Sequence, residues 1–179
     1  MAQMSNGNSA PGAPAAGDPT GNPADNPLAQ QLIINAQYIK DLSFENPRAP
    51  HTLAQQATNP AVEINVDVNA QNLSPDTYEV VLTVRAGAKI EGETLFLTEL
   101  AYGAVVTVRN LARDMLPAVL LVEVPRLMFP FARNIIADAT RDGGYPPLMI
   151  NPIDFTELLR RNQVPSPAGP GTPPQSTIV

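Results

Sequence analysis

Hydrophobic and polar residues alternate along most of the chain between residues 32 and 108. A side-chain period of two is typical of a β-strand with one buried face. The pattern predicts four strands, and it is cleanest in residues 62–68, where valine and isoleucine alternate with acidic and amide side chains. The other three strands are predicted at residues 32–45, 78–86 and 96–102.

For two of the predicted strands, the pattern also predicts which faces are apolar. For residues 32–45 we expect one shared face formed by Ile34, Ala36, Tyr38, Leu42 and Phe44. The strand at residues 96–102 carries large apolar groups on both faces, so we expect the chain's own core to cover one face and a second subunit the other. We expect that subunit interface at Phe96, Thr98, Leu100 and Tyr102, which lie opposite Leu97, Glu99 and Ala101.

The alternation stops after residue 108, and the following pattern is helical. We expect a first helix at residues 112–123 and a second one that begins at Pro125, because proline is tolerated in the first turn of a helix. Gly143 and Gly144 are suitable residues for the end of the second helix. An apolar stripe at helical spacing is predicted to face the core, and it consists of Phe131, Ile135 and Ala139.

A short last helix is predicted from Asp154 to Arg161, since Asp154 followed by Glu157 resembles a capping box. Strands followed by helices favour an α+β fold with a four-stranded antiparallel sheet. Prolines are concentrated near both ends, so we expect disordered tails at residues 1–31 and 162–179. Residues 32–161 would then form one domain.

Composition excludes several classes of function. The 179 residues contain no cysteine and one histidine, so thiol catalysis and a thiolate or multi-histidine metal site are excluded. We also expect no membrane insertion, since no apolar stretch is long enough to span a bilayer. Residues 40–99 hold nine acidic and four basic residues, a net charge of −5, which makes nucleic acid a poor partner and favours a basic protein.

Five sequence strings in the same order resemble those of one known family. They are KDLSFENP at 40–47, YEVVL at 78–82, ETLFLTE at 93–99, LMFPFAR at 127–133 and PLMINPIDF at 147–155. Together they resemble the bacterial export chaperones of the SecB family. The resemblance implies a dimer of dimers without enzyme activity or cofactor, which holds unfolded precursor proteins in the cytoplasm and passes them to the SecA motor ATPase.

The resemblance also implies roles for individual residues. In the family, positions that match Asp41, Glu45, Leu97 and Glu99 contact SecA. Apolar residues near the second strand and the last helices form client grooves, which makes Ile64, Tyr78 and Leu159 the candidates here. The residues after Arg161 carry no charge, unlike the family tails that contact the zinc-binding end of SecA, so that second contact stays open.

Two alternatives remain at this stage. A related chaperone that serves a toxin–antitoxin pair or general proteostasis would have the same sequence features, because the sequence does not indicate the client. A ligand-binding or catalytic α+β domain would need a group of convergent polar residues. The single histidine and the absence of cysteine argue against that second alternative.

Overall fold

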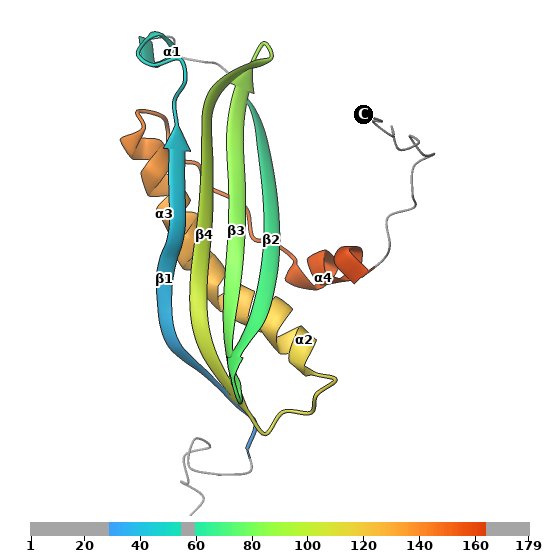
Figure 1. Ribbon diagram of the computed structural model, residues 1–179. Coiled ribbons are helices and arrows are strands. Elements are labelled where there is room, and N and C mark those ends of the chain that lie inside the picture. The colour runs from blue at the N-terminus through green and yellow to red at the C-terminus, as the bar shows by residue number, and fades with distance from the viewer. Residues whose placement is uncertain (1–28, 55–59, 164–179) are drawn as a thin grey trace, which may run out of the picture.

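The computed structural model describes residues 29–54 and 60–163. In this part of the chain, one four-stranded antiparallel sheet is followed by helices that cross one of its faces (Figure 1). The strand order is β1-β4-β3-β2, so β1 and β2 form the two edges. The architecture confirms the predicted α+β fold. The predicted tails lie outside the described residues, apart from residues 29–31 and 162–163.

Three strands follow one another through two tight turns. They are β2 (Ala61–Ser74), β3 (Thr77–Ile90) and β4 (Glu93–Arg109). The turn between β3 and β4 has positive φ at both of its central residues, 52° at Glu91 and 84° at Gly92. That conformation gives a two-residue hairpin turn the twist of its flanking strands, which is why a glycine is favoured there.

Strand β1 (Gln31–Glu45) pairs with β4 and contains two irregularities. The register shifts by one residue after Ile34 and again after Ile39. An extra residue in a strand turns the following side chains to the opposite face. Between the two shifts, Ala36 and Tyr38 therefore point away from the other three members of the predicted apolar face. The prediction of one shared face is wrong for these two residues.

The helices after the sheet form one continuous run. It consists of α2 (Leu116–Ala118), the π-helical turn η2 (Val119–Glu123) and α3 (Val124–Asp142). The predicted break at Pro125 is wrong, and the run begins four residues later than the predicted start at residue 112. Pro125 has no N–H to bond within a helix, and the wider π-helical turn before it lets the chain continue without a break.

Helix α3 packs on the sheet with a different stripe from the one predicted. The buried residues are Val124, Pro125, Met128, Phe129, Ala132, Ile136, Ala137 and Thr140. Phe131 is 54% exposed, and Ile135 and Ala139 are only half-buried, although Ile135 still packs against the core cluster. The predicted stripe therefore lies beside the buried face of the helix, and Phe131 lies outside the core. Two apolar stripes lie side by side on this helix, and spacing alone does not distinguish the one that contacts the sheet.

The core lies between this helical run and the covered face of the sheet. Leu82 and Leu100 of the two central strands are fully buried and pack in one cluster with Met128, Ile136 and Phe155. The last helix, α4 (Phe155–Gln163), supplies Phe155 to this cluster. Ring contact between Phe129 and Phe155, with centroids 6.0 Å apart, joins α4 to α3.

Two short elements complete the described chain. Helix α1 (His51–Ala54) follows β1, and α4 begins directly after Asp154. The Asp154 carboxylate accepts hydrogen bonds from the backbone N–H groups of Thr156 (2.9 Å) and Glu157 (3.0 Å). It thereby satisfies two N–H groups that have no partner inside the helix, as expected for a capping residue.

Candidate functional site

One face of the sheet is left uncovered by the helices, and we call it the open face. Glu45 lies directly opposite Leu97 across the β1–β4 pair, and Ser43 lies opposite Glu99. Directly opposed residues share a face, and strand alternation adds Asp41 to the same side. The structure therefore brings the four predicted SecA-contacting residues together on the open face. Leu97 is 45% exposed there although it is apolar.

Ion pairs cross the strands of the open face. They join Arg85 to Glu99 at 2.7 Å, Lys89 to Glu63 at 3.2 Å and Lys40 to Glu79 at 2.8 Å. The hydrogen bond from Arg85 lowers the pKa of the Glu99 carboxyl. In contrast, Asp41 and Glu45 form no ion pair with any residue that the structure describes. These two carboxylates are therefore available to a positively charged partner.

Glu79 differs from the other acidic residues of the open face because it is only 5% exposed. Its carboxylate accepts hydrogen bonds from the Tyr38 hydroxyl, from the Gln71 side-chain amide and, at 2.8 and 2.9 Å, from Lys40 Nζ. Lys40 and then Tyr38 are the main reasons why the pKa of Glu79 is lowered. We call these four residues the Glu79 cluster, and they come from three strands of the sheet. Sequence reasoning missed the cluster.

Tyr38 reaches Glu79 by lying across β4 at Gly103. A Cβ atom at position 103 would lie 2.7 Å from Cζ of the Tyr38 ring, which is closer than real contacts allow. Glycine at this position therefore makes room for the ring. The residue after Ile39, where the β1 register shifts, is Lys40, so the bulge and the glycine together bring two β1 side chains to a carboxylate on β3.

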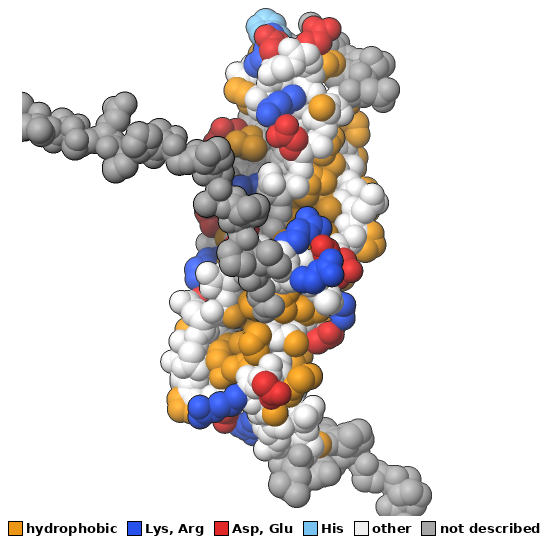
Figure 2. Space-filling model, turned by 90° about the vertical axis from the view of Figure 1, so that its right-hand side faces the viewer, with side chains coloured by type: hydrophobic (Ala, Val, Ile, Leu, Met, Phe, Trp, Pro, Cys, Tyr) orange, Lys and Arg blue, Asp and Glu red, His pale blue; other side chains and the backbone are white. Residues whose placement is uncertain are grey.

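A second surface lies along edge strand β2, on the side of the molecule that faces the viewer in Figure 2. A hollow of about 560 Å³ is lined mainly by apolar groups, among them Val62, Leu95, Phe96, Tyr145 and Leu148. An adjoining hollow of about 710 Å³ shares Val62 and Leu148 with the first one. Its further lining residues include Ile64, Val66, Met149, Ile153 and Leu158. We call the two hollows together the β2 groove.

Aromatic side chains form one wall of the β2 groove. The rings of Phe44 and Phe96 stack with centroids 5.7 Å apart, and Tyr145 lies 5.0 Å from Phe96. The Tyr145 hydroxyl is fixed by polar atoms of three other segments, at 2.9 Å from Asn46 Oδ1, 3.0 Å from Thr52 Oγ1 and 3.1 Å from the Leu95 carbonyl oxygen. These contacts fix the position of the Tyr145 ring at the edge of the hollow.

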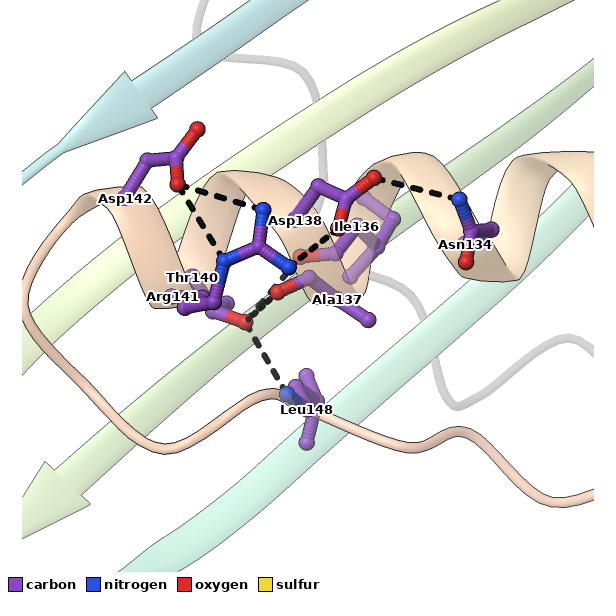
Figure 3. A network of polar contacts seen from close by, with 8 residues as sticks. All are labelled: Asn134, Ile136, Ala137, Asp138, Thr140, Arg141, Asp142 and Leu148. Atoms are coloured by element: carbon purple, nitrogen blue, oxygen red, sulfur yellow. Dashed lines mark hydrogen bonds and ion pairs between the residues drawn. The ribbon is translucent and has the colours of Figure 1, made fainter.

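The segment after α3 lines the groove further along, and buried Thr140 holds it in place (Figure 3). Thr140 Oγ1 donates to the carbonyl oxygens of Ile136 and Ala137 and accepts a hydrogen bond of 2.9 Å from the Leu148 N–H. Leu148 lines both hollows of the groove. Figure 2 shows hydrophobic side chains on this side of the molecule above and below a group of charged ones.

The structure places the three predicted client-binding residues differently. Ile64 lines the β2 groove and is 39% exposed. Leu159 is half-buried against the core, and its neighbour Leu158 lines the groove instead. Tyr78 lies away from the groove, in another hollow beside Arg113. Exposed Met149, at 64%, was missed, because a single methionine between a leucine and an isoleucine does not stand out in the sequence.

The residues expected at the subunit interface are buried within one chain. Phe96 and Tyr102 are 5% and 7% exposed, and Thr98 and Leu100 are fully covered. Leu100 and Tyr102 point toward the chain's own helices and belong to the same core cluster as α3 residues, whereas Phe96 packs with Ala88 and Leu95. This placement leaves little of their surface for a second subunit.

Two kinds of feature are absent from residues 29–54 and 60–163. No helix in these ranges has the length and apolar character needed to cross a membrane. Likewise, no group of three or more His, Asp or Glu side chains in them is placed to hold a metal ion.

Comparison with known proteins gives consistent results. The family described as preprotein translocase subunit SecB matches residues 25–165. A protein-export protein SecB from Paramagnetospirillum magneticum is 55% identical over 131 residues, which are 73% of this chain and 84% of the relative. A second protein-export protein SecB, from Rhodopseudomonas palustris, is 50% identical over 79% of this chain and 90% of its own length.

A solved structure has the same fold at much lower sequence identity. It is the Mycobacterium tuberculosis SecB-like chaperone Rv1957 in complex with a ChAD peptide from the antitoxin HigA1. The TM-score is 0.58 and the identity 12%, over 68% of this chain and 90% of that one. The family match and the close relatives together confirm the resemblance seen in the sequence, and the chain belongs to the SecB family.

Proposed function

We propose that this chain is an ATP-independent chaperone that holds precursor proteins unfolded in the cytoplasm and delivers them to SecA for export. The observation that carries the proposal is the exposed β2 groove, an apolar surface separate from the acidic open face. An unfolded client offers apolar side chains and unpaired backbone amides, and the groove suits both. Apolar groups line it, and β2 has no neighbouring strand on its outer side in the described chain.

The client half of the proposal is tested by charging the groove. Val62→Asp with Ile64→Asp should weaken capture of an unfolded precursor by about tenfold or more, since apolar anchors dominate such binding. Leu73→Asp is the control for a charge added elsewhere on the same strand, because Leu73 is an exposed apolar residue (51%) and lines neither hollow. Wild-type protein should ignore the folded mature form of the same client. Equal capture by the groove variant and the control would contradict the proposal.

The delivery half of the proposal concerns the open face. Asp41, Glu45 and Glu99 would attract a basic surface of SecA, with Leu97 as an apolar contact. The two unpaired carboxylates on β1 support this assignment, because charge complementarity increases encounter rate and specificity. SecA binding should therefore weaken as salt is added, whereas capture of an apolar client should weaken little. A SecA affinity that stays constant between low and high salt would contradict the assignment.

The proposal includes assembly into a homotetramer, a dimer of dimers. Several apolar side chains stay exposed in one chain, on α3, on edge strand β1 and directly before α2: Leu127 (49%), Phe131 (54%), Ile39 (49%), Leu42 (41%) and Met115 (49%). Apolar surface of this extent supports association with further copies. Light scattering at micromolar concentration should give about four times 19.1 kDa. Phe131→Glu should lower that mass, and a wild-type monomer would contradict the assembly.

A further inference from the structure

The Glu79 cluster separates two oppositely charged neighbours in the sequence. Lys40 and Asp41 follow one another in β1, yet no ion pair joins them among the described residues. Instead, Lys40 Nζ lies 2.8 and 2.9 Å from the two carboxylate oxygens of Glu79 on β3. The Lys40 side chain is 46% exposed, so burial does not hold it there; the contact with Glu79 does.

Several features of the fold serve this one contact. The register shift after Ile39 sits at Lys40, and Gly103 leaves room for Tyr38 to cross β4 toward Glu79. Gln71 of β2 reaches the same carboxylate from the other side. Glu79 is thereby almost completely covered on a face that has no helix above it, and its negative charge is directed at Lys40 and not at solvent.

We propose that Glu79 is a positioning residue of the open face, which holds the Lys40 ammonium away from Asp41 and Glu45 and keeps these two carboxylates free for a basic partner. The inference rests on the proposed function, since it assumes that SecA docks on this face. An ammonium released from Glu79 would lie well within a Debye length of Asp41, about 8 Å at physiological salt, and would oppose a basic partner there.

A purely structural role for the cluster makes a different prediction. If Glu79 only ties three strands together, any substitution in the cluster weakens docking through a loosened sheet, and a second substitution adds to the damage. If Glu79 acts through the Lys40 charge, removing that charge restores docking even though the cluster stays broken. The two roles therefore predict opposite effects of adding Lys40→Gln to Glu79→Gln: SecA binding becomes stronger if Glu79 positions Lys40 and weaker if Glu79 only ties the strands together.

The test measures binding of purified full-length protein to SecA at low salt. Glu79→Gln should weaken binding by about threefold, the size expected for one uncompensated surface charge. Adding Lys40→Gln to Glu79→Gln should return the affinity to the wild-type value. Capture of an unfolded precursor by each variant reports whether it is folded.

Glu123→Gln is the matched control. It removes the carboxylate partner of Arg126 with the same change in net charge, but Glu123 and Arg126 lie on the helical run, which crosses the other face of the sheet. Glu123→Gln should therefore leave SecA binding nearly unchanged. An effect as large as that of Glu79→Gln would assign the loss to net charge and overturn the proposal.

Three further outcomes would overturn the proposal about Glu79. Wild-type binding by Glu79→Gln, or weakened binding that Lys40→Gln fails to restore, overturns the proposal. If Glu79→Gln does not fold, Ser43→Lys places an ammonium between Asp41 and Glu45 without touching the cluster, and it should weaken binding more than Ser43→Gln does. Equal binding by these two variants overturns the proposal as well. The proposed docking on the open face fails if Asp41→Lys with Glu45→Lys leaves SecA binding unchanged, so that failure is distinguishable from failure of the Glu79 proposal.

Discussion

The two faces of the sheet are built from the same four strands but differ in what covers them. On the helix side, Leu82, Leu100 and Val106 are fully buried in one apolar cluster. On the open face, the side chains between them form ion pairs or stay partly exposed, as Leu97 does at 45%. The difference shows that alternate side chains of the same strand have different roles: those on the helix side stabilise the fold, and those on the open face are free to bind a partner.

The largest expected effect is a difference in stability between two substitutions on β4, one on each face of the sheet. Leu100→Ala should lower the free energy of unfolding by about 2–5 kcal/mol, because it removes fully buried methyl groups and leaves a cavity. Leu97→Ala, three residues earlier on the open face, should change it by less than about 0.5 kcal/mol. Urea denaturation of both variants measures the difference. Similar losses at the two positions would contradict the assignment of stability to the helix side.

A smaller effect tests the close packing on the open face. Gly103→Ala should destabilise the protein by about 1–3 kcal/mol, since the added Cβ atom overlaps the Tyr38 ring and forces it to move. In a Tyr38→Ala background the same glycine substitution should cost much less. A double-mutant cycle by urea denaturation measures this coupling, and an unchanged cost in that background would show that the ring is not the cause.

The stabilisation by the Glu79 cluster should decrease at acidic pH, because the pKa of Glu79 is lowered in the folded protein. The pKa of Glu79 is lowered from its ordinary value of 4.5, chiefly by Lys40, so the unfolded chain binds the proton more readily. The stabilisation is therefore present above pH 4.5 and is lost as the pH falls through the lower folded value. Urea denaturation of wild type and Glu79→Gln should differ most at pH 7 and progressively less below pH 4.5. A gap that grows on acidification would contradict the ion pair.

The smallest expected effect concerns the Arg85–Glu99 pair. Both side chains are exposed, 60% and 37%, so Arg85→Gln should leave the midpoint of urea denaturation nearly unchanged. It should strengthen SecA binding slightly at low salt, because the Glu99 carboxylate loses its internal partner. Titration of SecA at two salt concentrations measures this, and weaker binding at low salt would indicate that Arg85 itself contacts the partner.

The sequence predicts most of the elements but not the irregularities between them. Alternation locates all four strands because each has one apolar face, as residues 62–68 illustrate within β2. The shifts in β1 escape detection because they depend on pairing with β4, more than 50 residues away in the sequence. Likewise, nothing local in α3 indicates that the stripe of Met128, Ala132 and Ile136 is buried and that Phe131 is exposed.

The candidate sites, too, could be predicted from the sequence only in part. Strand parity predicts that Asp41 lies with Glu45 and Leu97 with Glu99, and the structure adds that the two pairs share one face. That these residues bind SecA stays a prediction. The Glu79 cluster and the β2 groove require contacts between distant segments, which no local pattern encodes. Family membership confirms the predictions of an export chaperone and of a protein without enzyme activity.

The central claim is that docking and client capture use different surfaces, and one measurement tests it most directly. Asp41→Lys with Glu45→Lys should weaken SecA binding by about tenfold or more at low salt, while capture of an unfolded precursor and the mass in light scattering stay at wild-type values. Asp114→Lys with Glu123→Lys makes the same change in net charge at exposed positions before and within the helical run, and it should leave SecA binding nearly unchanged. Unaltered SecA binding by the first variant, or an equal loss in both, would contradict the account.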